Sequence, residues 1–437
     1  MGAVAFKIGI ALLTAVAGRW ALRSPAIAAM PDAVFLRCAV AIQLVTALAL
    51  FSALYVLGGQ EVTSDVPGYY MPAARAVLSG QVPYRDFGLS YAPLFPYIGG
   101  ALMLAWDSGK IFALFAILLN VLALVQWHGA ARTLLGPRAA RTSSIWYATS
   151  GLVLVQTLLG TNQVWIAAAL SGSVLLQASG RHAAAGFVQS LSLCTTKFLT
   201  LLFWPMLFIC SDRRARWAAG SLPLPLVIYG ATAALGGDFL DPLRHEGALI
   251  SSGNLPYVLE PLLHAAGLAN RLVFDAAAAL ALAGVIGWLL RCAQRVAVAR
   301  RPQLLLDGLA LVGLVFMAVS KKSFTGYAVF FMYPALAVLA RSSGRLGTRH
   351  WLLAGFNVAL AAEPSIWFHL GGDSLPLSSW LPRLRPVTAV GFVGLELVLI
   401  LCYFGLGYLA VTSISRTVRG ASTSDTVDQP STALSSA

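Results

Sequence analysis

The chain has 437 residues, of which 58% are apolar and only 11% are charged, and its formal net charge is +13. In an ordinary soluble domain about a quarter of the residues are charged. A chain this apolar has too little polar surface to cover itself in water. The composition therefore excludes a soluble globular enzyme and a disordered or fibrous protein. It predicts an all-α polytopic membrane protein, in which basic cytoplasmic loops rather than a nucleic-acid partner explain the positive charge.

The apolar runs give the predicted elements in chain order. Residues 1–33 are expected to form a cytoplasmic or interfacial segment, because the apolar stretch 2–22 carries Lys7 and Arg19 and is followed by Arg23. A transmembrane helix or a signal peptide are the alternatives there. Two short runs, 183–196 and 198–211, predict a pair of short helices that meet at Lys197. The longer candidate spans, of about 20 residues each, cover residues 34–57, 110–131, 142–160, 163–179, 217–235, 271–291, 303–320, 324–340, 351–369 and 387–410.

Basic residues lie in alternate loops between these spans, so the positive-inside rule assigns those loops and both termini to the cytoplasm. About 12 transmembrane helices result, with two long outer loops at 58–109 and 236–270. The apolar stretch 92–106 then cannot cross the membrane. We expect this stretch and the amphipathic stretch 69–79 to lie at the outer interface. Residues 271–415 supply the C-terminal helices, and residues 416–437, rich in Ser, Thr and Ala, predict a disordered cytoplasmic tail.

The first outer loop holds the strongest candidate for chemistry. Asp65 follows the first of these spans by a few residues and precedes an aromatic helix that starts near Pro67. A carboxylate held against a surface of low dielectric constant can act as a general base on a bound hydroxyl group. The simpler alternative is that Asp65 caps the helix N-terminus, with Ser64 as a rival cap.

The order and spacing of Asp65, Tyr69, Gly80, Pro83–Tyr84 and Tyr91–Ala92–Pro93 resemble the first outer loop of the glycosyltransferase C superfamily. Members of this superfamily are polytopic enzymes that use polyprenyl-phosphate-linked sugars as donors. The closest branch is the bacterial polyprenol-phosphate-mannose-dependent alpha-mannosyltransferase group. The resemblance covers residues 34–340 and implies that residues 34–240 form the conserved transmembrane module of that fold. It also implies that Asp65 is the catalytic base.

Two later segments extend the resemblance. Thr195–Thr196–Lys197 resembles the lysine-containing break between two short helices, and Ser320–Phe324 with Tyr327 resembles the late outer-face segment. The resemblance implies that these lysines bind the donor phosphate. The alternatives are that Lys197 extends to the lipid headgroups, and that Lys321 and Lys322 are solvated in a loop. The candidate phosphate-binding residues are Lys197, Lys321, Lys322, Arg244 and His245. The candidate sugar- or acceptor-binding residues are Tyr69, Tyr84, Arg85, Asp86, Tyr91, Asn162, Gln163, Asn254, Tyr327 and Glu363, the last with Arg383 or Arg385 as an alternative partner.

One departure concerns metal ions. Metal-dependent members of the superfamily place an acidic residue in the next outer turn, which here reads Gly160–Thr161–Asn162–Gln163. Because hard cations bind carboxylate oxygens, we expect no metal ion and no other cofactor.

The resemblance implies transfer of a hexose, with mannose as the first guess, from a polyprenyl-phosphate donor to a lipid-linked or envelope glycoconjugate. The site would face the periplasmic side of the bacterial inner membrane, and an upstream synthase would load the carrier lipid, because the chain has no nucleotide-binding motif. The alternatives are a flippase or transporter of lipid-linked glycans, and a glycan polymerase or ligase.

Overall fold

The computed structural model describes residues 2–247, 249–343, 345–372 and 374–424, and their regular structure is helical. Within these residues the one β pairing is an isolated bridge between Pro83 and Phe87. The prediction of an all-α membrane protein is therefore confirmed. The expected disordered tail begins as helix, since α21 (Pro386–Ser424) continues to Ser424, and residues 425–437 lie outside the described part.

Six described helices are long and apolar enough to cross a membrane, or seven if two helices joined by a 118° bend, α8 (Gly151–Leu158) and α9 (Gln163–Ala178), form one broken span. The expected number of about 12 spans is thus not confirmed. The six are α1 (Gly2–Arg23), α3 (Asp32–Phe51, extended by a π-helical turn to Leu57), α6 (Lys110–Leu135), α16 (Arg271–Gln294), α17 (Leu305–Val319, counted from Arg300 with the preceding 3-10 turn) and α21.

Several expected spans are interrupted for local reasons. Residues 142–160 form α7 (Pro137–Ala148) and α8, because the Ser150 hydroxyl accepts a bond from the Val153 amide (3.4 Å) and starts a new helix. Residues 217–235 divide into α12 (Arg214–Ser221) and α13 (Pro223–Ala234), where Pro223 opens the second helix. Residues 324–340 are a 3-10 helix (Thr325–Phe331) followed by α18 (Met332–Arg341), and 351–369 lie within α19 (Leu346–His369).

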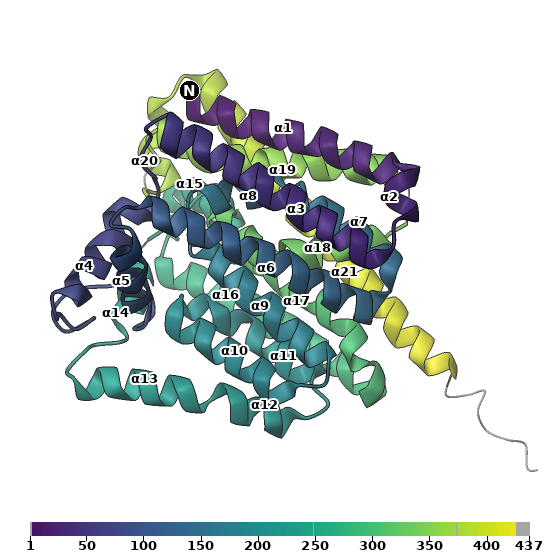
Figure 1. Cartoon of the computed structure of the whole chain (residues 1–437). Helices are drawn as coiled ribbons and strands as arrows, with labels where there is room; N and C mark the ends of the chain where they lie inside the picture. The colour runs from purple at the N-terminus through teal and green to yellow at the C-terminus, as the bar shows by residue number, and fades with distance from the viewer. Residues whose placement is uncertain (1, 248, 344, 373, 425–437) are drawn as a thin grey trace, which may run out of the picture.

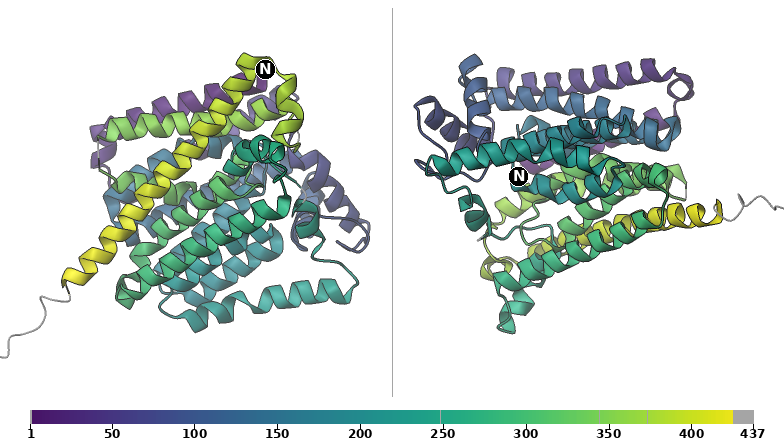
Figure 2. Two further views of the ribbon diagram at one scale, coloured as in Figure 1. Left: turned by 180° about the vertical axis from the view of Figure 1, so that it is seen from behind. Right: turned by 90° about the horizontal axis from the view of Figure 1, so that it is seen from below.

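The N-terminal segment, expected at the interface with a transmembrane helix as an alternative, forms a helix that is long and apolar enough to cross a membrane. Helix α1 packs along α19 in antiparallel fashion, with Gly18 against His350 at one end and Lys7 Nζ bonded to Ser365 Oγ (2.6 Å) at the other. The N-terminus lies beside α20 (Leu377–Trp380), whereas α21 runs out at the opposite end of the bundle (Figures 1 and 2). An apolar helix tolerates Lys7 because its ammonium group has this partner.

The helices lie side by side, and both long connecting segments extend from the same end of the bundle, which we call the loop end (Figure 1). There α4 (Met71–Leu78) and α5 (Phe95–Ala105) meet the second segment, since the Asp238 amide donates to the Tyr84 carbonyl (3.3 Å). The second segment carries α14 (Asp241–Gly247) and α15 (Leu255–Ala265). The 11 residues of α5 extend about 16 Å, roughly half the hydrocarbon thickness, which agrees with the prediction that 92–106 does not cross.

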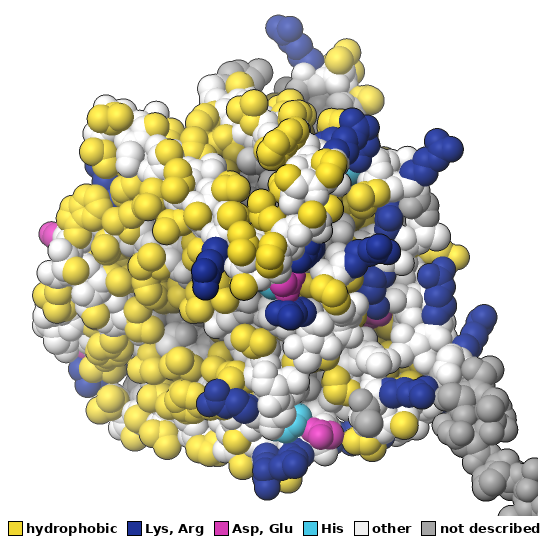
Figure 3. All heavy atoms as spheres, turned by 45° about the vertical axis from the view of Figure 1, so that its right-hand side comes forward, with side chains coloured by type: hydrophobic (Ala, Val, Ile, Leu, Met, Phe, Trp, Pro, Cys, Tyr) yellow, Lys and Arg dark blue, Asp and Glu magenta, His cyan; other side chains and the backbone are white. Residues whose placement is uncertain are grey.

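The opposite end is basic. Lys and Arg side chains gather over it (Figure 3), in agreement with the alternation of basic loops in the sequence. Asp32 at the start of α3 pairs with Arg132 (3.1 Å) and Arg141 (2.9 Å), which ties α3 to α6 and α7. Between the two ends the bundle has an apolar core in which Trp127 stacks on Tyr333.

Candidate active site at the loop end

Asp65 lies just before a π-helical turn (Val66–Tyr70) that leads into α4. Its side chain makes no capping bond to that turn, so the N-cap explanation is not supported. Instead, Asp65 Oδ2 accepts a hydrogen bond from the Tyr91 hydroxyl (2.6 Å). The carboxylate is half-buried, which leaves it accessible to a second donor while one tyrosine fixes its orientation.

Tyr91 connects this carboxylate to the lysine break. Its ring is buried, with 3% exposed, and Lys197 Nζ lies 4.5 Å from the ring centroid, within the range of a cation–π contact. Burial, together with the neighbouring Tyr70 and Asp65, holds the pKa of Tyr91 well above its usual value. The phenol therefore stays neutral and donates its proton to the Asp65 bond.

Lys197 stands between α10 (His182–Thr195) and a 3-10 turn (Phe198–Phe203), which continues into α11 (Trp204–Cys210). The predicted pair of short helices is thus confirmed. The break also binds the first loop segment, since the amides of Ala92 and Leu94 donate to the carbonyls of Thr196 (2.9 Å) and Cys194 (3.0 Å). These carbonyls are free because α10 ends there, so two motifs more than 100 residues apart form one unit.

The late segment brings two further residues. Tyr327 is buried with its ring 5.8 Å from Lys197 Nζ, and it also hydrogen-bonds that lysine. Lys322 is half-buried, and burial and then the nearby charge of Lys197 lower its pKa to about 7, whereas Asp65 acts in the opposite direction. Two ammonium groups and one carboxylate thus converge from three segments.

Lys321 is directed elsewhere. Its Nζ pairs with Asp275 Oδ2 on α16 (2.6 Å) and its side chain is only 3% exposed. The prediction placed both lysines at the donor phosphate, but the structure brings only Lys322 into the cluster. Lys321 holds the segment to α16.

A similar difference separates two tyrosines. Tyr69, the residue expected from the motif, is 53% exposed, whereas Tyr70 is fully buried. Tyr70 packs edge-on against Tyr91 with ring centroids 5.1 Å apart. Its hydroxyl oxygen accepts a hydrogen bond from the backbone amide of Asn162 (3.0 Å). The sequence analysis missed Tyr70, although the paired tyrosines at 69 and 70 were the signal that could have suggested it.

Asn162 and Gln163 lie between α8 and α9, next to this cluster. Both side-chain polar atoms of Asn162, and Oε1 of Gln163, are buried and have no hydrogen-bond partner among the residues that the structure describes. A buried polar atom without a partner costs about 1–3 kcal/mol. These amides therefore remain candidates for binding a polar ligand, as the sequence analysis predicted.

The remaining candidates of the first loop bind one another. The Tyr84 hydroxyl donates to the Tyr91 carbonyl, while Arg85 pairs with its neighbour Asp86 (2.8 Å), which also accepts from the Val82 amide (2.7 Å). The Arg85 guanidinium and that amide lower the pKa of Asp86 to about 2. Tyr84 therefore holds the backbone of Tyr91 in place. The Arg85–Asp86 pair stabilises the turn at residues 82–86 and does not belong to the Asp65 cluster.

The second loop contributes less than expected. Arg244 pairs with Asp238 in the exposed part of that loop. The side chain of His245 lies outside those that the structure describes. Asn254 caps α15, since its Oδ1 accepts from the Tyr257 amide (3.0 Å). Its predicted role in sugar binding thus has a structural alternative.

Glu363 does not reach the loop-end surface. It is buried, with 1% exposed, within α19, and its Oε2 accepts from the Thr325 hydroxyl (2.8 Å). It also hydrogen-bonds Ser252 and Glu396. Its polar environment is therefore this interior network rather than the expected arginines of the 380s.

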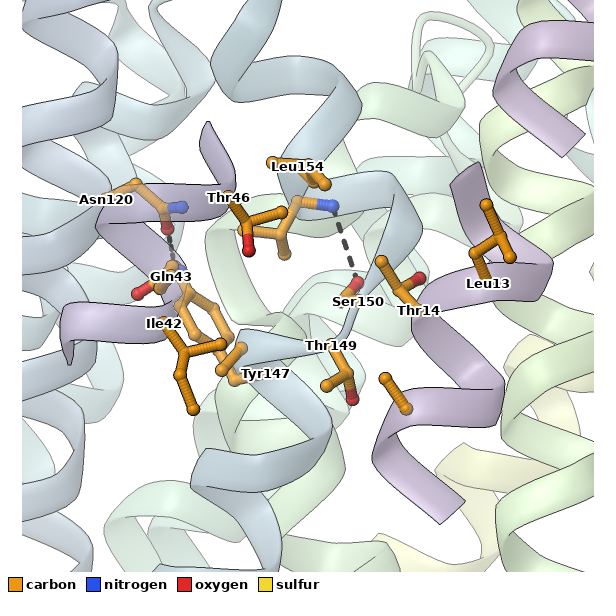
Figure 4. A pocket seen from close by; sticks show the side chains of 13 residues that line it. Leu13, Thr14, Ile42, Gln43, Thr46, Asn120, Tyr147, Thr149, Ser150 and Leu154 are labelled. Atoms are coloured by element: carbon orange, nitrogen blue, oxygen red, sulfur yellow. Dashed lines mark hydrogen bonds between the residues drawn. The ribbon is translucent and has the colours of Figure 1, made fainter. Parts of the chain in front are cut away.

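A separate cavity of about 240 Å³ lies between α1, α3, α6 and the α7–α8 break (Figure 4). Its lining includes Gln43, Asn120 and Tyr147, none of which belongs to the Asp65 cluster. In the part of the chain with described side chains, no three His, Cys, Asp or Glu residues are placed to hold a metal ion. The cluster is thus a carboxylate, a tyrosine bridge and two lysines.

No protein-family model matches the chain, and a search of curated proteins finds no match. The fold and composition alone define the class: an α-helical multi-pass membrane protein.

Proposed function

We propose that this protein is a membrane glycosyltransferase that moves a hexose from a polyprenyl-phosphate donor to a hydroxyl group of a lipid-linked or envelope glycoconjugate. The observation that carries the proposal is the placement of Asp65 and Lys197 against the same tyrosine, one at its hydroxyl group and one at its ring. This brings a base and a cation together at the loop end of a membrane bundle, where the donor phosphate and the acceptor hydroxyl group can both be bound.

In the proposed reaction, Asp65 accepts the proton of the acceptor hydroxyl group as its oxygen forms a bond to the anomeric carbon. The bond from that carbon to the phosphate oxygen breaks, and polyprenyl phosphate leaves with the electron pair. Lys197 and Lys322 balance the negative charge on the leaving phosphate. One base and no second nucleophile in the cluster favour a single displacement with inversion at the anomeric carbon.

The neutral Tyr91 hydroxyl orients the Asp65 carboxylate and keeps one of its oxygens occupied, which leaves the other for the acceptor. The unpartnered amides of Asn162 and Gln163 are available for sugar hydroxyl groups. Mannose remains the first donor to test. The outer, periplasmic position of the site and the bacterial inner membrane as its location belong to the same proposal.

The test is transfer of radiolabelled mannose from polyprenyl-phosphate mannose to native lipid extract in proteoliposomes. We expect Asp65→Asn to insert normally and to lose about 10²–10⁴-fold in rate, the usual contribution of a general base. Tyr91→Phe should lose less, because it removes only the orienting bond. Tyr69→Phe is the matched control and should transfer at the wild-type rate, since Tyr69 faces away from the cluster. Near-full transfer by Asp65→Asn would refute the assignment of the base.

The same assay tests the expectation that no metal ion takes part. Chelation by EDTA should leave the transfer rate unchanged, because the turn at 160–163 supplies no carboxylate. Loss of transfer on chelation that Mn²⁺ restores would contradict this part of the proposal. If folded wild-type protein transfers no mannose, a panel of donor sugars and a flipping assay would distinguish another transferase from a flippase.

A further inference from the structure

A second buried polar network lies inside the bundle, behind the 3-10 turn that carries Tyr327. Its centre is a pair of carboxyl groups, Glu363 on α19 and Glu396 on α21, which are 1% and 0% exposed. The two carboxyl groups lie within hydrogen-bonding reach of each other. Two ionised carboxylates have no donor for such a bond, so a positive charge must lie between or beside them.

Each carboxyl group uses one oxygen to bind the protein. Oε2 of Glu396 accepts from the Gly253 amide (2.5 Å), and Oε2 of Glu363 accepts from the Thr325 hydroxyl (2.8 Å). Their other oxygens, both Oε1, are buried and accept no bond from a residue with described side chains. Two buried oxygens, one on each carboxyl group, are thus left without a donor from the described part of the protein.

Tyr403 gives an independent indication of a ligand. Its side chain is 1% exposed, and its hydroxyl group has no hydrogen-bond partner among the described residues. It interacts electrostatically with both glutamates, so the hydroxyl group lies close to the pair. A buried hydroxyl group without a partner is costly, and three such oxygens at one place form the ligand set that a proton or a hard cation prefers.

The charges around the pair set the charge of the occupant. Lys7 on α1 faces Glu363, and Tyr257 on α15 and Tyr403 on α21 are the other titratable groups that face the pair. Two carboxylates and one ammonium group sum to −1, and a net charge inside a membrane bundle is strongly unfavourable. One added positive charge makes the network neutral, whereas a divalent ion would leave it at +1.

We propose that Glu363, Glu396 and Tyr403 form a buried site for one monovalent cation, a proton or an alkali ion. Occupancy holds α19 and α21 together and keeps Gly253 and Thr325 in place, which fixes the second loop against the segment that carries Lys322 and Tyr327. This inference is independent of the proposed sugar transfer.

The test measures thermal unfolding of the full-length protein in nanodiscs across a pH series, in buffer with choline as the only added cation and again with added Na⁺, Li⁺ or K⁺. Loss of the bound charge leaves two carboxylates against each other, so the unfolding temperature of the wild type should fall as the pH rises. If the occupant is a proton, alkali ions should not restore it. If the occupant is an alkali ion, Na⁺ or Li⁺ should restore it at the alkaline end.

Glu396→Gln and Glu363→Gln supply an amide donor that needs no cation, and both should lose this fall with pH and the effect of alkali ions. Asp107→Asn is the control, because Asp107 is an exposed carboxylate paired with Arg75, and it should keep the wild-type dependence. Equal dependence in all variants, no dependence in the wild type, or stabilisation by Mg²⁺ or Ca²⁺ alone would overturn the proposal.

If neither glutamine variant folds, infrared spectra of wild-type protein with ¹³C-labelled glutamate decide instead. They should show either a protonated carboxyl band or a carboxylate band that shifts with Li⁺, and the lack of both would overturn the proposal.

Discussion

At the scale of single residues, neighbours in the sequence have opposite positions. Lys321 is bound to α16 while Lys322 faces Lys197, and Tyr69 is exposed while Tyr70 is buried beneath Tyr91. The motifs indicated which segments carry the chemistry. They could not choose between adjacent side chains, because that choice depends on partners which other segments bring into contact.

Lys322 gives a prediction about pH. Its cationic form is the one that attracts the donor phosphate, and its pKa is lowered to about 7 by burial and by the Lys197 charge. We therefore expect kcat/KM for the polyprenyl-phosphate donor to fall as the pH rises through about 7 in the free enzyme. Lys322→Arg should move this fall to much higher pH, because arginine stays protonated. An unchanged profile in the arginine variant would assign the fall to another group.

The same lysine predicts an effect on stability. The pKa of Lys322 is about 7 in the folded protein and about 10.4 in the unfolded chain. At pH values between these two, Lys322 binds a proton in the unfolded chain but not in the folded protein. The contribution of Lys322 to stability should therefore rise with pH in this window, in the opposite direction to the fall expected from the Glu363–Glu396 pair, and its unfavourable effect is fully present below the window. Lys322→Met should flatten that part of the curve of unfolding temperature against pH relative to the wild type.

At the scale of elements, interruptions in helices create the site. The end of α10 at Thr195 frees two carbonyls that bind the segment after Tyr91, and the turn between α8 and α9 presents Asn162. Lys197 and its flanking short helices were predictable, because each of the apolar runs beside the lysine is shorter than a membrane span. The interruption at Ser150 was not, since the surrounding sequence is apolar enough for one continuous span.

The Lys321–Asp275 pair gives a prediction at this scale, because it joins α16 to the segment 320–324. Asp275→Asn leaves a buried ammonium group without its charged partner, and we expect a loss of about 1–3 kcal/mol in stability, which is less than a fully buried pair would lose because Asp275 is half-exposed. The KM for the donor should stay at the wild-type value, as measured in the proteoliposome assay. A higher KM with unchanged unfolding temperature would instead place Lys321 at the donor phosphate.

At the scale of the whole molecule, the position of α1 bears on the membrane topology, which the structure does not itself contain. The chain ends lie at opposite ends of the bundle (Figures 1 and 2), because α1 packs against α19 along its length and Lys7 finds a partner in Ser365. The basic residues alone had indicated two cytoplasmic termini. The two observations point in different directions because Lys7 was counted with the cytoplasmic basic residues, whereas in the structure it bonds to Ser365 within the bundle.

Single cysteines placed near each terminus test this topology. After reaction with a membrane-impermeant thiol reagent in intact cells or sealed vesicles, we expect residues near position 2 and residues near position 420 to be labelled from opposite sides. A cysteine at exposed Tyr69 should be labelled from the same side as the N-terminus. Labelling of both termini from one side would show that α1 does not cross.

The sequence by itself determined the class of protein and the two long segments, because composition and basic loops are local properties. The resemblance of its motifs added Asp65, Lys197, Tyr91 and Tyr327 as a candidate set. Only the tertiary structure decided that Tyr91 lies between Asp65 and Lys197, that Lys322 and not Lys321 joins them, and that Glu363 meets Glu396. Such pairings join residues far apart in the chain, and the packing of whole helices fixes them.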